Sequence, residues 1–254
     1  MKYIRYRNMM DRTSHTNPTS THLKSSSELG EKRSIAFEAW FIRHAQSVAN
    51  MGGRTRNPTD IPLTDEGHRQ AQELCDRMDV TPSAIATSSF LRAQQTAAPL
   101  LARFPEAKRV SLPLEEFTYL SPSSCQDTTQ HERRPAVDAY WQRADPYHCD
   151  GPGAESFANL MTRAETTLQW LDSDRQPLVF LVCHELFIRA VIWRCLLSSL
   201  SNAINNMAAF RAYQQTDSLP NTSITKLSCS TLRQLSISLP FCLQLELTSA
   251  RPEL

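Results

Sequence analysis

Short apolar runs, separated by amphipathic stretches, form the main pattern of this chain. The runs are rich in Ile, Val, Leu and Phe and are bounded by polar or turn-forming residues, which is typical of strands buried in a sheet. The predicted strands are residues 35–42, 83–87, 109–112, 178–183, 223–229 and 241–247.

Amphipathic stretches follow most of these runs and predict helices. Between 155 and 171, for example, Phe157, Leu160 and Leu168 recur at helical spacing and share one face. Thr64 precedes an acidic turn and is expected to be an N-cap. The predicted helices are residues 64–78, 90–103 and 155–171, one that starts near 186, and a short piece at 136–143.

Strands that alternate with helices predict an α/β fold, here a three-layer α/β/α sandwich with a mostly parallel central sheet. We expect one domain over residues 34–254, in which 117–152 is an inserted segment that sets substrate specificity. Residues 1–33 are polar, Ser/Thr-rich and basic, and they predict a disordered tail because they cannot bury enough apolar surface. An organelle-targeting segment is the alternative, which the Asp and Glu residues weaken.

Composition excludes several classes of partner. The formal net charge is +1, so no overall field favours nucleic acid or a membrane surface. The most apolar window, 178–200, contains His184, Glu185, Arg189 and Arg194, too many ionisable groups for the centre of a bilayer. No apolar core follows the early basic residues, so no signal peptide is expected. The seven scattered cysteines form no C-x-x-C pair and indicate thiols in a reducing, cytoplasmic compartment.

Polar clusters directly follow three of the predicted strands. Arg43 and His44 end the first strand, Arg92 lies one turn into the helix after the second, and His184 ends the strand at 178–183. Because ligands bind beyond the carboxyl ends of strands in open α/β sheets, we expect these side chains to share one crevice.

These residue types suit phosphoryl transfer. Arginine grips phosphate in a bidentate fork, and each close cation contributes about 4 kcal/mol at 4 Å and an effective dielectric of 20. A neutral imidazole can attack phosphorus and form a covalent intermediate. Departure of the leaving group then requires a proton donor.

Six motifs, taken in order, carry a resemblance to a known family. The chain resembles the histidine phosphatase superfamily, that is, the phosphoglycerate mutase-like phosphatases, from about residue 37 to about residue 228. The motifs are RHAQSVAN, IPLTDEGHRQA, TSSFLRAQQTA, GPGAES, LVCHELFIRA and PNTSITKL. Each motif alone is weak, whereas the ordered set is specific.

The resemblance implies a role for six residues. His44 would be the nucleophile that becomes phosphohistidine, and Arg43, Arg92 and an imidazolium at His184 would clamp the phosphoryl oxygens. Asn50 matches the phosphate-pocket asparagine of the family. The proton donor would be Glu116, with Glu115 as the alternative. The resemblance implies no metal and no organic cofactor.

Two positions depart from the family pattern. Ala45 replaces a common glycine, which matters only if that residue needs a positive φ. Glu185 also replaces a glycine, and an ionised carboxylate about 6 Å from the phosphate would oppose binding by roughly 3 kcal/mol. Glu185 lies four residues before Arg189, and we expect the two to pair and direct the carboxylate away from the phosphate.

Three functions are compatible with the sequence. The first is a phosphatase that acts on a phosphomonoester of a small molecule through phosphohistidine at His44. The second is a phosphoglycerate mutase-type phosphoryl transferase, although the residues after Glu116 do not resemble the mutase continuation. The third is an impaired, phospho-ligand-binding pseudoenzyme. Five basic residues are expected at the substrate mouth or on ordinary surface: Arg54, Arg56, His131, Arg133 and Arg134.

Overall fold

A computed structural model describes residues 4–5, 37–216, 218–229 and 235–238 of the chain. Its strands form one seven-stranded sheet in the order β1-β7-β6-β2-β5-β3-β4. The strands are β1 Ile4–Arg5, β2 Phe37–Arg43, β3 Ala84–Thr87, β4 Lys108–Val110, β5 Leu178–Cys183, β6 Ile224–Cys229 and β7 Leu235–Ser238.

The sheet is mixed, with a parallel half and an antiparallel half. Strands β2, β5, β3 and β4 run parallel to one another. Strands β6, β7 and β1 each pair antiparallel. The predicted α/β/α architecture is confirmed, and its parallel half is the half that carries the polar clusters.

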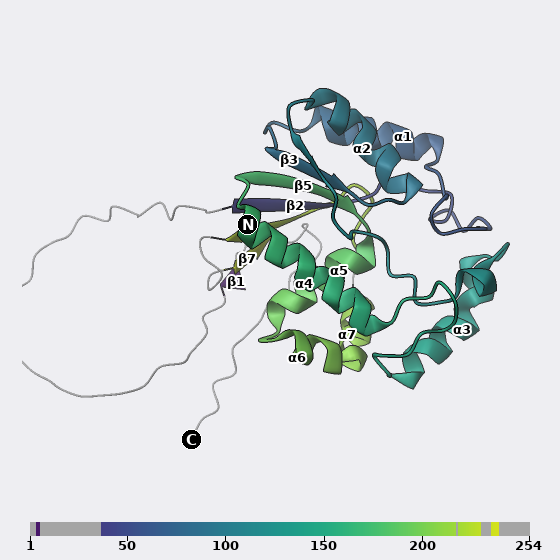
Figure 1. The fold of residues 1–254 in the computed structure, drawn as a ribbon. Coiled ribbons are helices and arrows are strands. Elements are labelled where there is room, and N and C mark those ends of the chain that lie inside the picture. The colour runs from purple at the N-terminus through teal and green to yellow at the C-terminus, as the bar shows by residue number, and fades with distance from the viewer. Residues whose placement is uncertain (1–3, 6–36, 217, 230–234, 239–254) are drawn as a thin grey trace, which may run out of the picture.

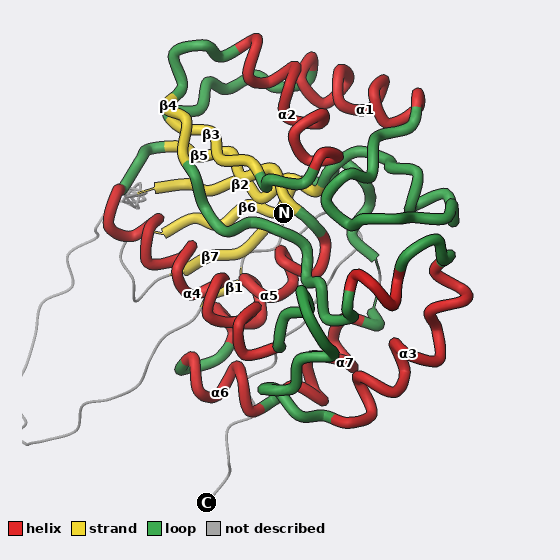
Figure 2. The backbone as a smooth tube through the Cα atoms, turned by 45° about the vertical axis from the view of Figure 1, so that its right-hand side comes forward, coloured by secondary structure: helices red, strands yellow, loops and turns green. Residues whose placement is uncertain are grey.

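Helices cover both faces of this sheet (Figure 1). Helices α1 and α2 pack on one face, while α4, α5, α6 and α7 lie on the other. Helix α3 projects beyond the sheet, next to the loops at its edge (Figures 1 and 2). The helices are α1 Asp65–Asp76, α2 Leu91–Arg103, α3 Gln130–Arg143, α4 Phe157–Asp174, α5 Glu185–Leu196, α6 Leu200–Asn205 and α7 Met207–Gln214.

Side chains on the central strands point alternately into two hydrophobic cores, one on each face of the sheet. Phe41 and Leu181 point into the core beneath α4 and α5, whereas Ile42 and Val182 point into the core beneath α1 and α2. Strand β5 is buried on both faces, which explains its continuously apolar sequence. This rigid centre fixes the ends of β2, β3 and β5.

Apart from α3, the described elements that the sequence predicts lie within three residues of their predicted bounds. Thr64 caps α1 as expected, since its side chain accepts a hydrogen bond from the Gly67 amide. Helix α3 begins at Gln130, six residues before the predicted start at 136, because Thr129 and Glu132 form a reciprocal capping box. The sequence did not predict α6 and α7.

Some predictions fall outside the part of the chain that the structure describes. The predicted strand 241–247 lies there, as does most of the predicted tail 1–33. Within that tail the two residues of β1 pair with Ile237 and Ser236 of β7. Among the described residues, no helix is both long and apolar enough to cross a membrane.

Candidate active site

Strand register brings the three polar clusters to one edge of the sheet. Arg43 at the end of β2 lies opposite Cys183 of β5. Thr87 at the end of β3 lies opposite Val182 of the same strand. The residues that immediately follow these strands therefore emerge side by side, as the strand order predicts.

The His44 ring is buried, and its hydrogen bonds define its tautomer. Nδ1 lies 2.7 Å from the carbonyl oxygen of Ala45, which can only accept, so Nδ1 carries the proton. Nε2 therefore keeps its lone pair and accepts a hydrogen bond from Arg92 Nε at 3.2 Å. Burial, together with the nearby charge of Arg92, lowers the pKa of His44 to about 3. The imidazole is neutral at physiological pH, as a nucleophile must be.

His184 lies beside His44 with ring centroids 5.1 Å apart. Its side chain is fully buried, and its Nε2 lies 2.7 Å from the Ser88 hydroxyl. Burial and the charge of Arg92 hold the pKa of His184 well below its usual range. Without a bound phosphate, this low pKa favours a neutral imidazole at neutral pH. A bound phosphate dianion would favour its protonation.

Arg92 is buried and held from three directions. Besides its bond to His44, it donates to the carbonyl oxygen of Pro58 at 2.7 Å and lies over the Phe90 ring, 5.0 Å from the centroid. Burial lowers the pKa of Arg92 to about 10, so it stays charged at neutral pH. A preorganised cation thus lies directly against the proposed nucleophile.

Glu185 forms ion pairs with both neighbouring arginines. Its Oε1 accepts from Arg189 Nε and Nη2 at 3.2 and 3.1 Å, which confirms the expected pair. Its Oε2 lies 2.9 Å from Nη1 of Arg43, so the carboxylate stays beside the site instead of turning away from it. The expected direction is therefore wrong, because the end of β2 supplies a second guanidinium.

Contacts through Leu219 fix the orientation of Arg43. Its Nη1 also donates to the carbonyl oxygen of Leu219, whose amide donates to Glu185 Oε1 at 3.2 Å. Arg43 Nε is buried and has no hydrogen-bond partner within the described chain. Burial and the charge of Arg92 are the larger causes of the lowered pKa of His44 and of His184, and the charge of Arg43 adds to both.

Ala45 fits its position without strain. It is not among the described non-glycine residues with positive φ, so the methyl group that replaces the family's glycine causes no backbone conflict. Its amide donates to Thr96 Oγ1 at 2.9 Å, and that hydroxyl donates to the carbonyl oxygen of Arg92 at 2.7 Å. Thr96 thus couples the loop after β2 to α2.

Glu116 and Glu115 occupy different environments. Glu116 lines a cavity together with Arg92, and burial raises the pKa of its carboxyl group. The Phe117 amide, which donates to Glu116 Oε1 at 2.9 Å, and the charge of Arg92 oppose that rise. Glu115 does not line the cavity, and its carboxylate accepts from the Ser89 amide at 3.4 Å. Of the two carboxylates, only Glu116 lines the cavity.

The backbone that carries Glu116 is anchored from α4. Arg163 forms a two-bond ion pair with Glu155, at 2.6 and 2.7 Å. The same guanidinium donates to the carbonyl oxygens of Pro113 and Glu115 at 2.8 and 3.0 Å. Arg163 therefore holds the segment immediately before Glu116 at two points.

Asn50 lies at the exposed edge of the site. Its Oδ1 accepts from the amide and hydroxyl of Ser47 at 3.0 and 2.9 Å. Asn221 connects it to the centre, donating to the carbonyl oxygen of His44 at 2.9 Å and lying 3.4 Å from Asn50 Oδ1. Thr222, with φ of 58°, makes the strained turn that positions Asn221.

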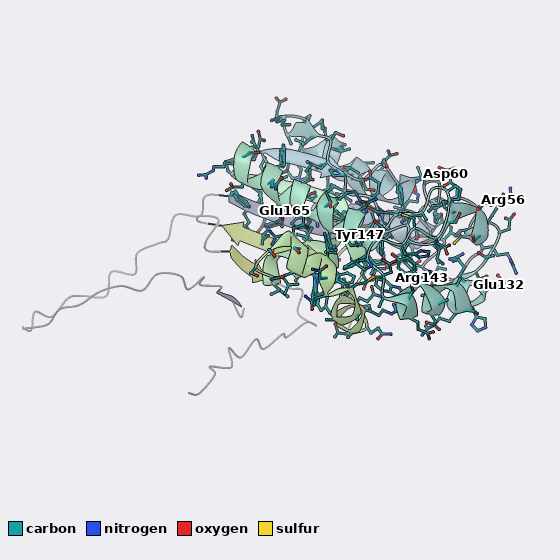
Figure 3. The ribbon with its side chains drawn as sticks, turned by 60° about the horizontal axis from the view of Figure 1, so that its bottom comes forward. Arg56, Asp60, Glu132, Arg143, Tyr147 and Glu165 are labelled. Atoms are coloured by element: carbon teal, nitrogen blue, oxygen red, sulfur yellow. The ribbon has the colours of Figure 1, made fainter. Side chains whose placement is uncertain are left out.

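The cavity in front of Arg92 has a volume of about 360 Å³. Three of the basic residues expected at the substrate mouth line it: Arg56, Arg133 and Arg134. Arg54 and His131 do not, and Arg54 instead pairs with Glu132. Figure 3 shows Arg56 and Glu132 at the same end of the molecule, away from Glu165.

Sequence reasoning missed several residues that shape the site. Ser88 directly follows β3 and contacts His184. Its position after a parallel strand is the signal that could have identified it as a site residue. Asn221 lies within the motif PNTSITKL but carried no assigned role. Arg163 lies mid-helix, where no local pattern distinguishes an anchoring arginine from a solvated one.

Comparison with known proteins agrees with this geometry. The model of the histidine phosphatase superfamily (branch 1) matches residues 39–233. The chain belongs to this superfamily. Its enzymes include phosphatases and phosphoglycerate mutases, in keeping with a phosphatase-type enzyme.

Three curated proteins illustrate the relationship within the superfamily. A 6-phosphofructo-2-kinase/fructose-2,6-bisphosphatase from Caenorhabditis elegans is 28% identical over 156 residues, 60% of this chain and 33% of that protein. A 2,3-bisphosphoglycerate-dependent phosphoglycerate mutase from Arabidopsis thaliana is 28% identical over 145 residues, 55% of this chain and 42% of that protein. One from Gloeobacter violaceus is 39% identical over 56 residues, 22% of this chain and 26% of that protein. The chain thus spans less than half the length of these curated relatives.

Solved structures share the fold at low sequence identity. A mycobacterial glucosyl-3-phosphoglycerate phosphatase superposes with a TM-score of 0.60 at 24% identity, covering 80% of this chain and 96% of that one. A putative α-ribazole-5'-P phosphatase from Escherichia coli gives 0.62 at 18% identity, covering 83% and 99%. A phosphoserine phosphatase from Entamoeba histolytica gives 0.55 at 20%, covering 75% and 90%.

Proposed function

We propose that this superfamily member is a phosphatase that hydrolyses a phosphomonoester of a small molecule through a phosphohistidine on His44. The observation that carries the proposal is the tautomer of His44. Its Nδ1–H is committed to the Ala45 carbonyl oxygen, so the lone pair of Nε2 lies against Arg92. A neutral nucleophile held beside a buried cation is the arrangement that attack on a phosphoryl group requires.

In the first half-reaction, Nε2 of His44 attacks phosphorus as the bond from phosphorus to the leaving oxygen breaks. Glu116 gives its proton to that oxygen, and the leaving group departs as an alcohol. The raised pKa of Glu116 supports this role, because burial favours the protonated carboxyl group.

In the second half-reaction, water attacks the phosphohistidine and the Glu116 carboxylate accepts its proton. The N–P bond breaks, which restores the neutral imidazole and releases inorganic phosphate. Arg43 and Arg92 would neutralise the equatorial oxygens in both steps. The Nε side of Arg43 is available for this, since Glu185 and Leu219 engage only its Nη1.

Cavity size supports a small substrate. A volume of about 360 Å³ is at the lower end of the range for small-molecule sites. The segment 117–152 supplies much of the wall, so we propose that it sets specificity, as loops on a fixed scaffold commonly do.

Turnover of an aryl phosphate tests the proposal. Wild-type protein should release phosphate from p-nitrophenyl phosphate, and His44→Ala should lose that activity while remaining folded. Glu165→Gln, which alters a carboxylate that pairs with Arg194 on α5, is the matched control. Equal turnover by wild-type and His44→Ala proteins would show that His44 is not the nucleophile.

The mutase alternative has a separate test. Interconversion of 2- and 3-phosphoglycerate without net phosphate release would identify a transferase. The proposed phosphatase should instead release phosphate and form no isomeric phosphoglycerate. A protein that binds phosphate but catalyses neither reaction would be the pseudoenzyme.

A further inference from the structure

The cavity that begins at Arg92 and Glu116 extends to α3. Its wall comes from four parts of the chain: the loop 49–61, the start of α2 at Phe90 and Arg92, the segment 116–125 and the first turns of α3. Part of this wall is apolar. The apolar side chains in it include Ile61, Phe90, Phe117, Tyr119, Leu120 and Val137.

Besides Arg92, three arginines line the same cavity, and carboxylates neutralise two of these three. Arg56 Nε lies 2.9 Å from Asp127, and Arg134 Nε lies 3.1 Å from Asp138. Both guanidiniums are largely exposed. Such pairs, in contact with solvent, leave little charge to attract another anion.

Arg133 differs from both because oxygen atoms without charge hold it. Its Nη1 donates to the carbonyl and hydroxyl oxygens of Thr128 at 2.7 and 2.9 Å, and lies 3.4 Å from Thr55 Oγ1. Within the described chain it has no carboxylate partner, and no hydrogen bond engages its Nε or Nη2. Arg133 is also only half exposed.

The three contacts at Nη1 fix one corner of the guanidinium and leave its opposite edge available. A planar edge with two N–H groups matches a carboxylate or a phosphate, each of which can accept two parallel hydrogen bonds. The uncompensated charge lies next to apolar side chains, where an ion pair is screened less than in open solvent.

We propose that Arg133 binds a second anionic group of the substrate, at the end of the cavity opposite the phosphoryl site. The inference rests on the proposed function. It names the substrate class: a phosphomonoester whose leaving group has an apolar, ring-sized body and carries a carboxylate or a second phosphate. Arg92 and Glu116 would bind the reacting end, the apolar wall the body, and Arg133 the distal anion.

Matched synthetic substrates test this specificity. 4-Carboxyphenyl phosphate and its homologue 4-(2-carboxyethyl)phenyl phosphate are each compared with the corresponding carboxamide, which has the same shape without the charge. 4-(Phosphonomethyl)phenyl phosphate separates preference for a phosphate from preference for a carboxylate. The wild-type protein should favour at least one anionic member by about ten- to a hundredfold in kcat/KM, the range expected for a charged hydrogen bond.

Variants assign the preference to one residue. Arg133→Gln should bring the ratio of anionic to neutral substrate close to one, mainly by raising KM for the anionic member. Arg133→Lys should retain part of the ratio. Arg134→Gln, which removes a neighbouring arginine already paired with Asp138, should leave the ratio unchanged.

Opposite results would overturn the inference. If Arg133 only anchors the loop at Thr128, Arg133→Gln will lower turnover of anionic and neutral substrates equally. A wild-type ratio near one for all pairs would exclude the second anion site even though the phosphatase is active.

Failure of the proposed function would look different. No aryl phosphate would then be hydrolysed, and calorimetric binding of 4-carboxybenzylphosphonate against its carboxamide would replace turnover as the measurement. Tighter binding of the carboxylate, lost in Arg133→Gln, would still support the inference, whereas equal binding of the two compounds would refute it.

Discussion

Arg43 and Glu185 are joined by an ion pair of 2.9 Å between the end of β2 and the start of α5. The carboxylate that replaces a family glycine thus contacts a proposed phosphate ligand directly. Its other oxygen is held by Arg189 and by the Leu219 amide. Glu185 therefore holds Arg43 at Nη1, while the buried Nε of Arg43 has no hydrogen-bond partner in the described chain.

This relationship predicts that Glu185→Gln weakens catalysis. Losing the ion pair frees Arg43 to leave its position, and misplaced groups lower rates by up to about a hundredfold. We expect kcat/KM for p-nitrophenyl phosphate to fall by about tenfold or more, with weaker binding of inorganic phosphate by calorimetry. Glu165→Gln is the control, because that carboxylate has similar exposure and also pairs with an arginine. Higher activity in Glu185→Gln would mean that the carboxylate mainly repels the phosphate.

If Glu116 is the proton donor, the loss of activity in Glu116→Gln should depend on the leaving group of the substrate. Glu116→Gln cannot donate a proton, so hydrolysis of alkyl phosphates should fall by about 10²–10⁴-fold. In kcat/KM, which reports the first half-reaction, the loss should be much smaller for p-nitrophenyl phosphate, because its leaving group departs without protonation. The kcat should fall for both substrates, because Glu116 also accepts the proton of the attacking water. Glu115→Gln should show neither effect. A larger loss in Glu115→Gln than in Glu116→Gln would reverse the assignment.

The raised pKa of Glu116 also determines the direction of the pH profile. Because the acid must be protonated, kcat/KM for an alkyl phosphate should decline as pH rises through the raised pKa. Glu116→Gln should abolish that decline. A decline of the same size in the variant would assign it to another group.

Burial of neutral His184 predicts a pH-dependent stability. Its folded-state pKa lies below the unfolded value of 6.5, so the unfolded chain binds a proton that the folded chain does not. Stability is fully present above pH 6.5 and is lost as pH falls below it, by about 1.4 kcal/mol per pH unit for one site. The free energy of unfolding should be measured with denaturant at several pH values. Its dependence on pH should be weaker in His184→Asn than in the wild type, by the amount that corresponds to about one bound proton. An unchanged slope would mean that His184 is protonated in the folded state.

Arg163 predicts a remote effect on catalysis. Arg163→Lys keeps the charge but cannot span Glu155 and the two carbonyl oxygens before Glu116. We expect a lower kcat with little change in KM, because the acid is displaced while the phosphate ligands remain. Arg194→Lys, which alters a similarly buried pair with Glu165, should leave kcat unchanged.

Local patterns sufficed for much of the fold. Both bounds of the strand 178–183 were predicted correctly, because a strand buried on both faces is apolar along its whole length. The direction of β6 was not predictable, since a strand sequence does not encode whether its neighbour is parallel. Helix α3 starts earlier than predicted because Thr129 and Glu132, three residues apart in the sequence, form a capping box there.

The sequence predicts only those features of the site that depend on where the strands end. The convergence of Arg43, His44 and His184 follows from parallel strands in register. The charge state of His184 did not follow, because desolvation depends on packing that the sequence does not reveal. The same holds for the contact between Glu185 and Arg43, which required the positions of both side chains.

The covalent intermediate at His44 provides the most direct test of the account. Wild-type protein should be mixed briefly with a radiolabelled phosphomonoester, quenched in alkali and digested, and the labelled peptide sequenced. The account predicts an alkali-stable, acid-labile phosphoryl group on residue 44, and none in His44→Ala. A label on another residue, or rapid turnover with no trapped label under conditions that retain phosphohistidine, would contradict it.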